Sequence, residues 1–267
     1  APRQSLVPGV AQADAPLVLV ADDHPINRRL MATQLGLLGL RGETAENGEA
    51  ALAMWRDGRY ALVITDCHMP KMDGYALTQA IRRIEDEEAR PRTPIFEWTA
   101  NALAEAAAHC HAAGMDNLLV KPVDLAQLKG ALSTWLTGAA AGAGDAGHEE
   151  PDDTAALPID FAGLDKLCAT TADRTEILQD FMAQTCADLA DLETALIKPN
   201  MQVSVRIAHR MKGASRMVGA RELAAACLAM ENAARQGHLE DADAVKTALD
   251  RLTAHLTETA CTNKDKK

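Results

Sequence analysis

Acidic residues follow two apolar runs in the first half of the chain. Asp22 and Asp23 come after residues 17–20, Leu-Val-Leu-Val. Asp66 comes after residues 61–65, Ala-Leu-Val-Ile-Thr. Ligands of open α/β sheets bind at the carboxyl ends of the strands, so these carboxylates are expected to lie together at such an edge. An oxygen-rich cluster of this kind suits Mg²⁺, which favours one or two carboxylates plus water and substrate oxygens.

A hydroxyl and an ammonium follow two later apolar runs. Thr99 comes after residues 95–98, and Lys121 comes after residues 117–120. Phosphoryl transfer to a carboxylate needs an in-line nucleophile, a divalent cation and fixed donors for the remaining charge. Asp66 is the candidate nucleophile. Each of these residues alone is more often structural, and only their joint arrangement favours this chemistry.

The order of two acids, a third acid, a hydroxyl and an ammonium, each at a strand end, resembles the receiver domain of response regulators in phosphorelay signalling. The resemblance implies that Lys121 pairs with the phosphoryl group as a point charge and that Thr99 donates its hydroxyl. The chain departs from the receiver pattern in two places. Receivers commonly carry an aromatic residue three before the lysine, where Leu118 stands here. They also carry small apolar residues before the threonine, where this chain has Glu97 and Trp98.

The same resemblance implies a Mg²⁺ site. Asp23 and Asp66 are expected to bind the metal directly, with the backbone carbonyl of His68 as the third protein ligand. Asp22 is expected to act mainly through water.

A histidine stands on a basic strip in the second half of the chain. At about 100° per residue, an apolar stripe facing a core is predicted for Ile207, Met211, Ala214 and Val218. The opposite side carries His209, Lys212, Gly213 and Arg216, so the imidazole is expected to point to solvent.

Residues 208–215, Ala-His-Arg-Met-Lys-Gly-Ala-Ser, followed by Gly219, resemble the motif of histidine-phosphotransfer (HPt) domains. Lys212 lies one helical turn from His209, where it can stabilise a phosphoramidate. Glu231, on the following helix, is expected to hold one tautomer of the imidazole, although a solvated glutamate is an equal alternative.

The pattern of the first half predicts βα units around a parallel sheet. Five strands interleaved with five helices make a flavodoxin-like doubly wound α/β fold. The strands are expected at residues 17–21, 41–45 (an edge strand), 60–65, 94–98 and 117–120.

The second half has helical periodicity only. Four amphipathic helices with short connections predict an antiparallel four-helix bundle. The helices are expected at residues 174–196, 202–218, 220–235 and 239–256, with a short one near 161–168. The predicted organisation is an N-terminal linker (1–15), a receiver domain (16–137), a flexible Gly/Ala-rich linker (138–157), an HPt domain (158–260) and a charged tail (261–267).

Composition excludes some classes of function. A net charge of −11 and 3% aromatic residues disfavour nucleic-acid binding, which needs a basic surface and stacking rings. The six scattered cysteines are expected to be reduced, which favours a cytoplasmic location. No apolar run approaches the length of about 20 residues that a membrane span needs. The chain begins without Met and is expected to be a fragment of a longer protein.

The order of the two domains resembles the C-terminal half of unorthodox hybrid sensor histidine kinases. The resemblance implies that Asp66 accepts a phosphoryl group from an upstream histidine kinase domain and passes it to His209, which donates it to the receiver of a downstream response regulator. No ATP-binding pattern occurs, so ATP use by this chain is not expected. Two alternatives stay open: a phosphate sink that drains the regulator, and a docking module without transfer.

Overall fold

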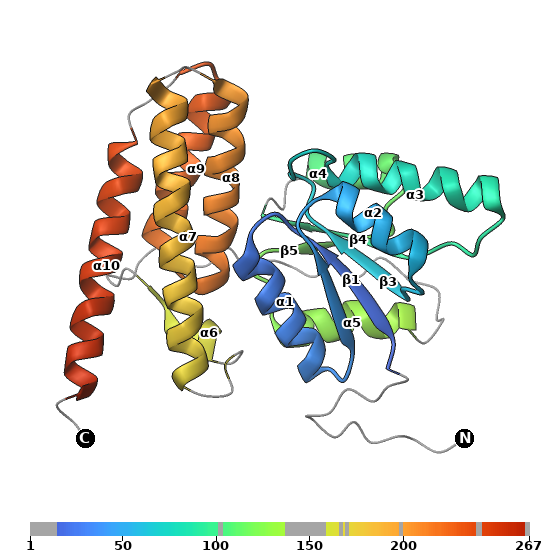
Figure 1. The fold of residues 1–267 in the computed structure, drawn as a ribbon, viewed down its shortest axis with the longest axis horizontal. Helices are drawn as coiled ribbons and strands as arrows, with labels where there is room; N and C mark the ends of the chain where they lie inside the picture. The colour runs from blue at the N-terminus through green and yellow to red at the C-terminus, as the bar shows by residue number, and fades with distance from the viewer. Residues whose placement is uncertain are drawn as a thin grey trace. The chain divides into compact units, whose positions relative to one another are not determined.

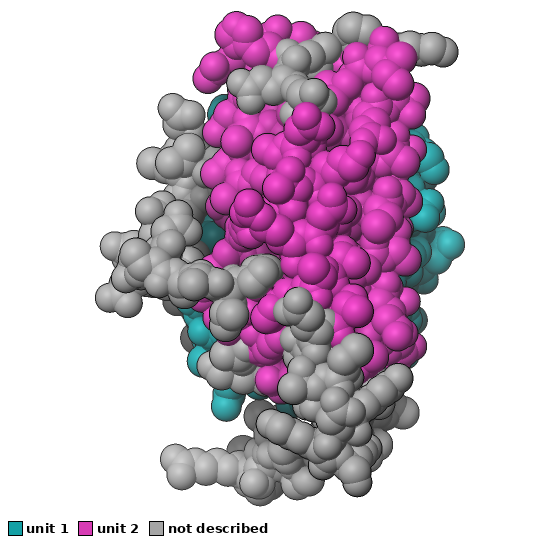
Figure 2. Space-filling model, turned by 90° about the vertical axis from the view of Figure 1, so that its left-hand side faces the viewer, with its two compact units in different colours: residues 1–155 teal, residues 156–267 magenta. Residues whose placement is uncertain are grey.

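The computed structural model describes residues 15–100, 104–136, 159–165, 168, 171–197, 200–238 and 242–264. The chain divides into two compact units, Ala1–Ala155 and Ala156–Lys267, which Figure 2 colours separately. Apart from Ala15, the two predicted linkers, residues 1–15 and 138–157, lie outside the described residues. The domain boundaries that were expected from composition therefore stay a prediction.

The first unit is built on a five-stranded parallel sheet with the strand order β2-β1-β3-β4-β5. The strands β1, β3 and β4 are buried along almost their whole length, as expected of strands covered on both faces. β2 lies at the edge of the sheet and is largely accessible, which confirms the prediction from its poorly apolar sequence. The strands are β1 (Leu17–Ala21), β2 (Arg41–Ala45), β3 (Leu62–Thr65), β4 (Ile95–Thr99) and β5 (Asn117–Val120).

Helices cover both faces of this sheet, with α1 and α5 on one face and α2, α3 and α4 on the other (Figure 1). This arrangement confirms the predicted flavodoxin-like fold. The helices are α1 (Pro25–Leu37), α2 (Gly48–Asp57), α3 (Gly74–Glu88), α4 (Ala104–Ala113) and α5 (Leu125–Leu136).

Side-chain caps fix where three of these helices begin, each directly after a strand or its loop. His24 accepts a hydrogen bond from the backbone of Ile26, with proline at the first helical position. Asn47 and Asp73 cap α2 and α3 in the same way. The chain therefore turns sharply at the carboxyl ends of β1, β2 and β3, which keeps the acidic residues at those ends close to the sheet.

The second unit is a bundle of four long helices with a short helix beside it (Figure 1). α8 packs against α7 and α9, α9 packs against α10, and α10 contacts α7, which closes the bundle. This confirms the predicted four-helix bundle. The helices are α6 (Phe161–Asp165), α7 (Thr171–Ile197), α8 (Met201–Val218), α9 (Arg221–Arg235) and α10 (Asp243–Lys264).

Two helix ends in the second unit are informative. Asn200 caps the start of α8, and Gly219 ends it in the left-handed conformation, with φ of 82°. α10 continues well beyond residue 256, where the prediction ended it, and includes residues 261–264 of the expected charged tail. Residues 265–267 lie outside the described residues.

Candidate functional site

Lys121 is the centre of the candidate site in the first unit. Its Nζ donates to Oδ2 of Asp22 and to Oδ2 of Asp66, each at 2.6 Å. All three side chains are buried. Burial alone would lower the pKa of Lys121, but the two carboxylates raise it above its ordinary value, so the side chain stays an ammonium.

The register of the strands explains this meeting. Ala21 of β1 pairs with Thr65 of β3, so the acids that follow them emerge side by side. Thr99 pairs with Val120, and the backbone N–H of Lys121 donates to the Thr99 carbonyl at 2.7 Å. Residues far apart in the sequence thus meet at one edge of the sheet, as the sequence predicted.

Asp22 is held firmly within its own loop. Its carboxylate accepts hydrogen bonds from the backbone N–H of His24 at 2.8 Å and from Nδ2 of Asn27 at 3.1 and 3.2 Å. With Lys121 as well, donors already surround this carboxylate. The contribution of Asn27 was missed from the sequence, because a residue on the first turn of a helix carries no signal of its own.

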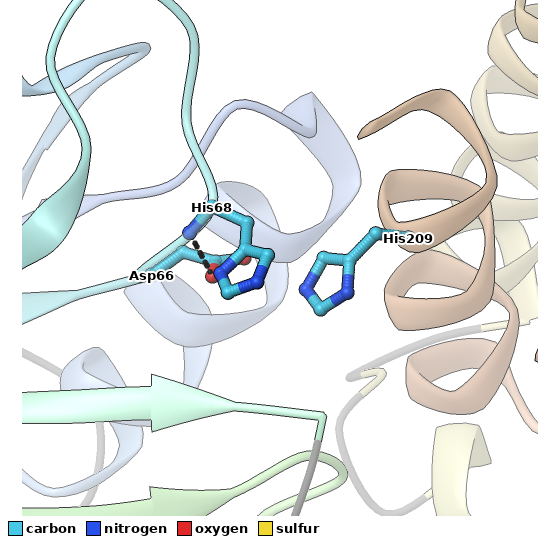
Figure 3. Close-up of side chains that lie close together, drawn as sticks. All are labelled: Asp66, His68 and His209. Atoms are coloured by element: carbon cyan, nitrogen blue, oxygen red, sulfur yellow. Dashed lines mark hydrogen bonds between the residues drawn. The ribbon is translucent and has the colours of Figure 1, made fainter. Parts of the chain in front are cut away.

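Asp66 is fixed from its own loop as well. Its Oδ1 accepts the backbone N–H of His68 at 3.0 Å, as Figure 3 shows. Gly74, at the start of α3, packs so tightly on the Asp66 carbonyl that a Cβ at this position would collide with it. The loop between β3 and α3 therefore leaves the Asp66 carboxylate little freedom to move away from Lys121.

Three carboxylates of this edge are placed to bind a cation. Asp22, Asp23 and Asp66 each offer an oxygen, and these oxygens lie within 4.8 Å of one another. With one ammonium among three carboxylates, the cluster keeps a net negative charge. Hard oxygen donors of this kind fit Mg²⁺. Asp23 is the most accessible of the three, whereas hydrogen bonds already surround the oxygens of Asp22.

Thr99 and Glu97 form a second buried group behind the carboxylates. Thr99 is the last residue of β4 and is 6% exposed. Glu97, 1% exposed, has the Thr99 hydroxyl and the thiols of Cys67 and Cys110 as hydrogen-bond partners. Burial raises the pKa of Glu97 above its ordinary value. Thr99 was predicted as a hydroxyl donor and Glu97 was noted as a departure from the receiver pattern, but their contact with each other and with the two thiols depends on side-chain directions that the sequence does not show.

The candidate site of the second unit lies between α8 and α9. Nδ1 of His209, which projects from α8 in Figure 3, lies 3.0 Å from Oε1 of Glu231 on α9. Lys212 donates to Oε2 of the same carboxylate at 2.6 Å, and its Nζ lies 3.4 Å from Nδ1 of His209. Arg235 also donates to Oε1 of Glu231, at 2.7 Å. The expectation that Glu231 contacts the imidazole is therefore fulfilled.

The charges of this group are mutually dependent. Burial would raise the pKa of Glu231, but His209 and Lys212 lower it well below its ordinary value. Burial lowers the pKa of Lys212, against the attraction of Glu231. Glu231 is therefore a fixed anion beside the histidine ring.

The apolar stripe predicted for α8 is confirmed, since Ile207, Met211, Ala214 and Val218 are all buried. The prediction of an open basic strip on the other side is wrong for Lys212, which is 3% exposed and, like His209, contacts Glu231. The physical reason lies in α9, which packs on α8 and presents Glu231 to both residues. The helical phase of one helix could not show that a neighbour covers its polar side.

Other expectations from composition can be compared with the described residues. Five of the six cysteines, at positions 67, 110, 168, 186 and 227, are free thiols. None of the described helices is both long enough and apolar enough to cross a bilayer.

Comparisons with known proteins agree with this geometry. The model of the response regulator receiver domain matches residues 18–133, and that of the Hpt domain matches residues 176–258. The virulence sensor protein BvgS of Bordetella pertussis is 35% identical over 226 residues, which cover 82% of this chain and 18% of BvgS. The sensor histidine kinase GacS of Pseudomonas protegens is 34% identical over 244 residues, which cover 89% of this chain and 26% of GacS.

The chain thus spans about a fifth to a quarter of the length of these two relatives. Among solved structures, the magnesium-containing receiver domain of sensor histidine kinase PA1611 from Pseudomonas aeruginosa is 33% identical. The aligned residues cover 46% of this chain and 98% of the PA1611 domain, with a TM-score of 0.42. The family matches to both halves show that this chain consists of a response regulator receiver domain followed by an Hpt domain.

Proposed function

We propose that this chain relays a phosphoryl group through two of its residues. Asp66 accepts the group from the phosphohistidine of an upstream histidine kinase domain, and His209 receives it from Asp66. His209 then donates it to the aspartate of a downstream response regulator. The observation that carries this proposal is the Lys121 ammonium, 2.6 Å from both Asp22 and Asp66, in a chain that also holds a histidine fixed by a buried anion.

The first step is the attack of an Asp66 carboxylate oxygen on phosphorus. The new O–P bond forms as the P–N bond to the upstream imidazole breaks, and the electron pair of that bond returns to the imidazole nitrogen. Lys121 is already within hydrogen-bond distance of the nucleophile and can pair with a phosphoryl oxygen. Thr99 lies at the same edge of the sheet and is the candidate hydroxyl donor.

Asp22, Asp23 and Asp66 are the side chains that would hold Mg²⁺, and the backbone of His68 lies beside them through its hydrogen bond to Asp66. A bound Mg²⁺ would supply positive charge to the phosphoryl oxygens. The hydrogen bonds around Asp22 support the expectation that it acts through water while Asp23 and Asp66 bind directly.

The second step requires a neutral imidazole with a lone pair on Nε2. Glu231 favours the tautomer that carries its proton on Nδ1, because a carboxylate accepts that hydrogen. Nε2 then attacks phosphorus, an N–P bond forms, and the O–P bond to Asp66 breaks to restore the carboxylate. Glu231 and Lys212 stabilise the positive ring and the phosphoryl charge, respectively.

The partners that this function requires are an upstream histidine kinase domain and a downstream receiver, which would meet the chain in the cytoplasm. The free thiols of the described residues support this location. We further propose that the chain acts as part of a longer, membrane-anchored sensor, in line with its partial coverage of its relatives. Nucleic acid is not a proposed partner, given the net charge of −11.

Phosphorylation with acetyl phosphate and Mg²⁺ tests the relay. We expect an alkali-labile label that requires Asp66 and an acid-labile, alkali-stable label that requires both Asp66 and His209. The variants are Asp66→Asn and His209→Gln, and the matched controls are Asp57→Asn and His238→Gln, both at exposed positions. An acid-labile label that survives in Asp66→Asn would contradict the order of transfer.

The two alternatives differ from the relay in measurable ways. A docking module without transfer predicts that Asp66→Asn leaves signalling to the downstream regulator intact. A phosphate sink uses the same residues, so it is separated from the relay by whether phosphate leaves the regulator faster than it arrives.

A further inference from the structure

The ring of Trp98 lies against the Lys121 ammonium. Nζ of Lys121 lies 4.6 Å from the centroid of the indole ring. Both side chains are fully buried. The electron-rich face of an aromatic ring attracts a cation, most strongly for tryptophan and when water is excluded. Lys121 therefore has three partners within reach: two carboxylates and one ring.

A tryptophan side chain that only filled the core would destabilise the fold at this position. Nε1 of Trp98 is buried and has no hydrogen-bond partner among the described residues. An unpaired buried donor destabilises a fold, and phenylalanine or leucine would avoid this loss. What indole offers above those residues is the stronger attraction of its ring face for a cation.

The backbone fixes the ring relative to the lysine. Trp98 stands opposite Leu119 in the pairing of β4 with β5, and the carbonyl of the next residue, Thr99, accepts the backbone N–H of Lys121 at 2.7 Å. The ring on β4 and the ammonium of the residue that follows β5 are therefore held by backbone pairing directly beside the contact.

We propose that Trp98 is a positioning residue for phosphoryl transfer at Asp66. The inference rests on the proposed function. When Asp66 forms its O–P bond, it loses the carboxylate charge that binds Lys121 in the structure described here. The ring of Trp98 keeps its charge distribution throughout. It holds the ammonium at the edge of the sheet while Lys121 exchanges an Asp66 oxygen for a phosphoryl oxygen.

The proposal predicts that Asp66 is phosphorylated faster when the side chain at position 98 attracts the Lys121 ammonium more strongly. With acetyl phosphate and Mg²⁺ in excess, we expect the parent to be phosphorylated fastest, Trp98→Phe more slowly and Trp98→Leu most slowly. The leucine variant should be about tenfold slower than the parent. Equal rates in the parent and both variants would overturn the proposal. Equal losses in both variants would also overturn it, because they would indicate a role in packing only.

Trp55 supplies a matched control. Its ring is also buried and also lies against a cation, with Cζ of Arg90 at 4.5 Å from the centroid, but Arg90 is not part of the carboxylate cluster. We expect Trp55→Leu to lower the thermal midpoint while leaving the phosphorylation rate of the folded protein near that of the parent. A tenfold slower rate in this control would assign the effect to general loosening of the core and overturn the proposal.

A second measurement needs neither metal nor phosphorylation. In metal-free protein, we expect Lys121→Met to change the tryptophan emission when Trp98 is present. In chains that already carry Trp98→Phe, the same substitution should leave the emission unchanged. An unchanged emission in the parent would overturn the contact itself. This result stands even if Trp98→Leu fails to fold. It also separates the two proposals, because a parent that is never labelled at Asp66 would overturn the relay, and the positioning role with it, even where the emission confirms the contact.

Discussion

Glu97 is a carboxylic acid in the interior of the receiver domain, and its surroundings favour the neutral form. Its hydrogen-bond partners are the thiols of Cys67 and Cys110 and the hydroxyl of Thr99, none of which carries a positive charge. Burial is the largest influence and raises its pKa. A protonated carboxyl can donate one hydrogen bond and accept others, which suits a position among such weakly polar groups.

This protonation predicts how stability depends on pH. Above the ordinary pKa of 4.5 the unfolded chain releases the proton of Glu97, while the folded domain keeps it up to its raised pKa. The folded state then binds more protons, so rising pH lowers the stability of the parent. Glu97→Gln does not titrate, and we expect it to gain stability over the parent by up to about 1.4 kcal/mol per pH unit within that window.

Urea unfolding followed by tryptophan emission measures this difference in the receiver domain alone, because the three tryptophans, at positions 55, 98 and 135, all belong to it. A stability difference that stays constant between about pH 5 and about pH 7 would show that Glu97 is ionised in the folded state.

The residues of the site differ in how far the sequence could reveal them. Asp22, Asp66 and Lys121 were predictable because each follows an apolar strand, and parallel strands end at one edge. The contact of Trp98 with Lys121 was not, because it depends on side-chain direction at two neighbouring strands. The contact of Lys212 with Glu231 was not predictable either, since it depends on which residue of α9 faces Lys212.

At the scale of elements, the end of α8 connects the bundle to the segment before α6. Gly219 has φ of 82°, and a Cβ there would collide with the carbonyl of Asp160. The backbone N–H of Asp160 also donates to the Gly219 carbonyl at 2.9 Å. Sequence patterns placed α7, α8 and α9 to within a few residues and missed the end of α10, but a packing contact of this kind between distant backbones leaves no periodic signal.

Gly219→Ala is therefore expected to destabilise the Hpt domain more than Gly237→Ala. Gly237 has a similar φ of 84°, but open space surrounds the position of its Cβ. The left-handed conformation alone costs alanine about 1–2 kcal/mol, and the collision with Asp160 adds to this at Gly219 only. Thermal unfolding followed by circular dichroism compares the two variants. Equal shifts of the midpoint would show that Asp160 moves aside without cost.

At the scale of the whole molecule, the chain divides into two compact units, and each carries one of the two proposed nucleophiles. We mix two variants, Asp66→Asn, which keeps His209, and His209→Gln, which keeps Asp66. We expect phosphate to pass from Asp66 of the His209→Gln chains to His209 of the Asp66→Asn chains. The rate should rise with total protein concentration, because the reacting residues then belong to different molecules. Absence of acid-labile label at every concentration would confine the transfer to a single chain.

The carboxylate of Glu231 is shared by three basic side chains, those of His209, Lys212 and Arg235. The charges around His209 are thus in place before the phosphoryl group that we propose it carries would arrive. Little of the surroundings has to reorganise when it binds or leaves, which favours rapid exchange in both directions. In the proposed relay, His209 would thus be a reversible carrier, and the rates at which its partners supply and remove phosphate would decide the direction of transfer.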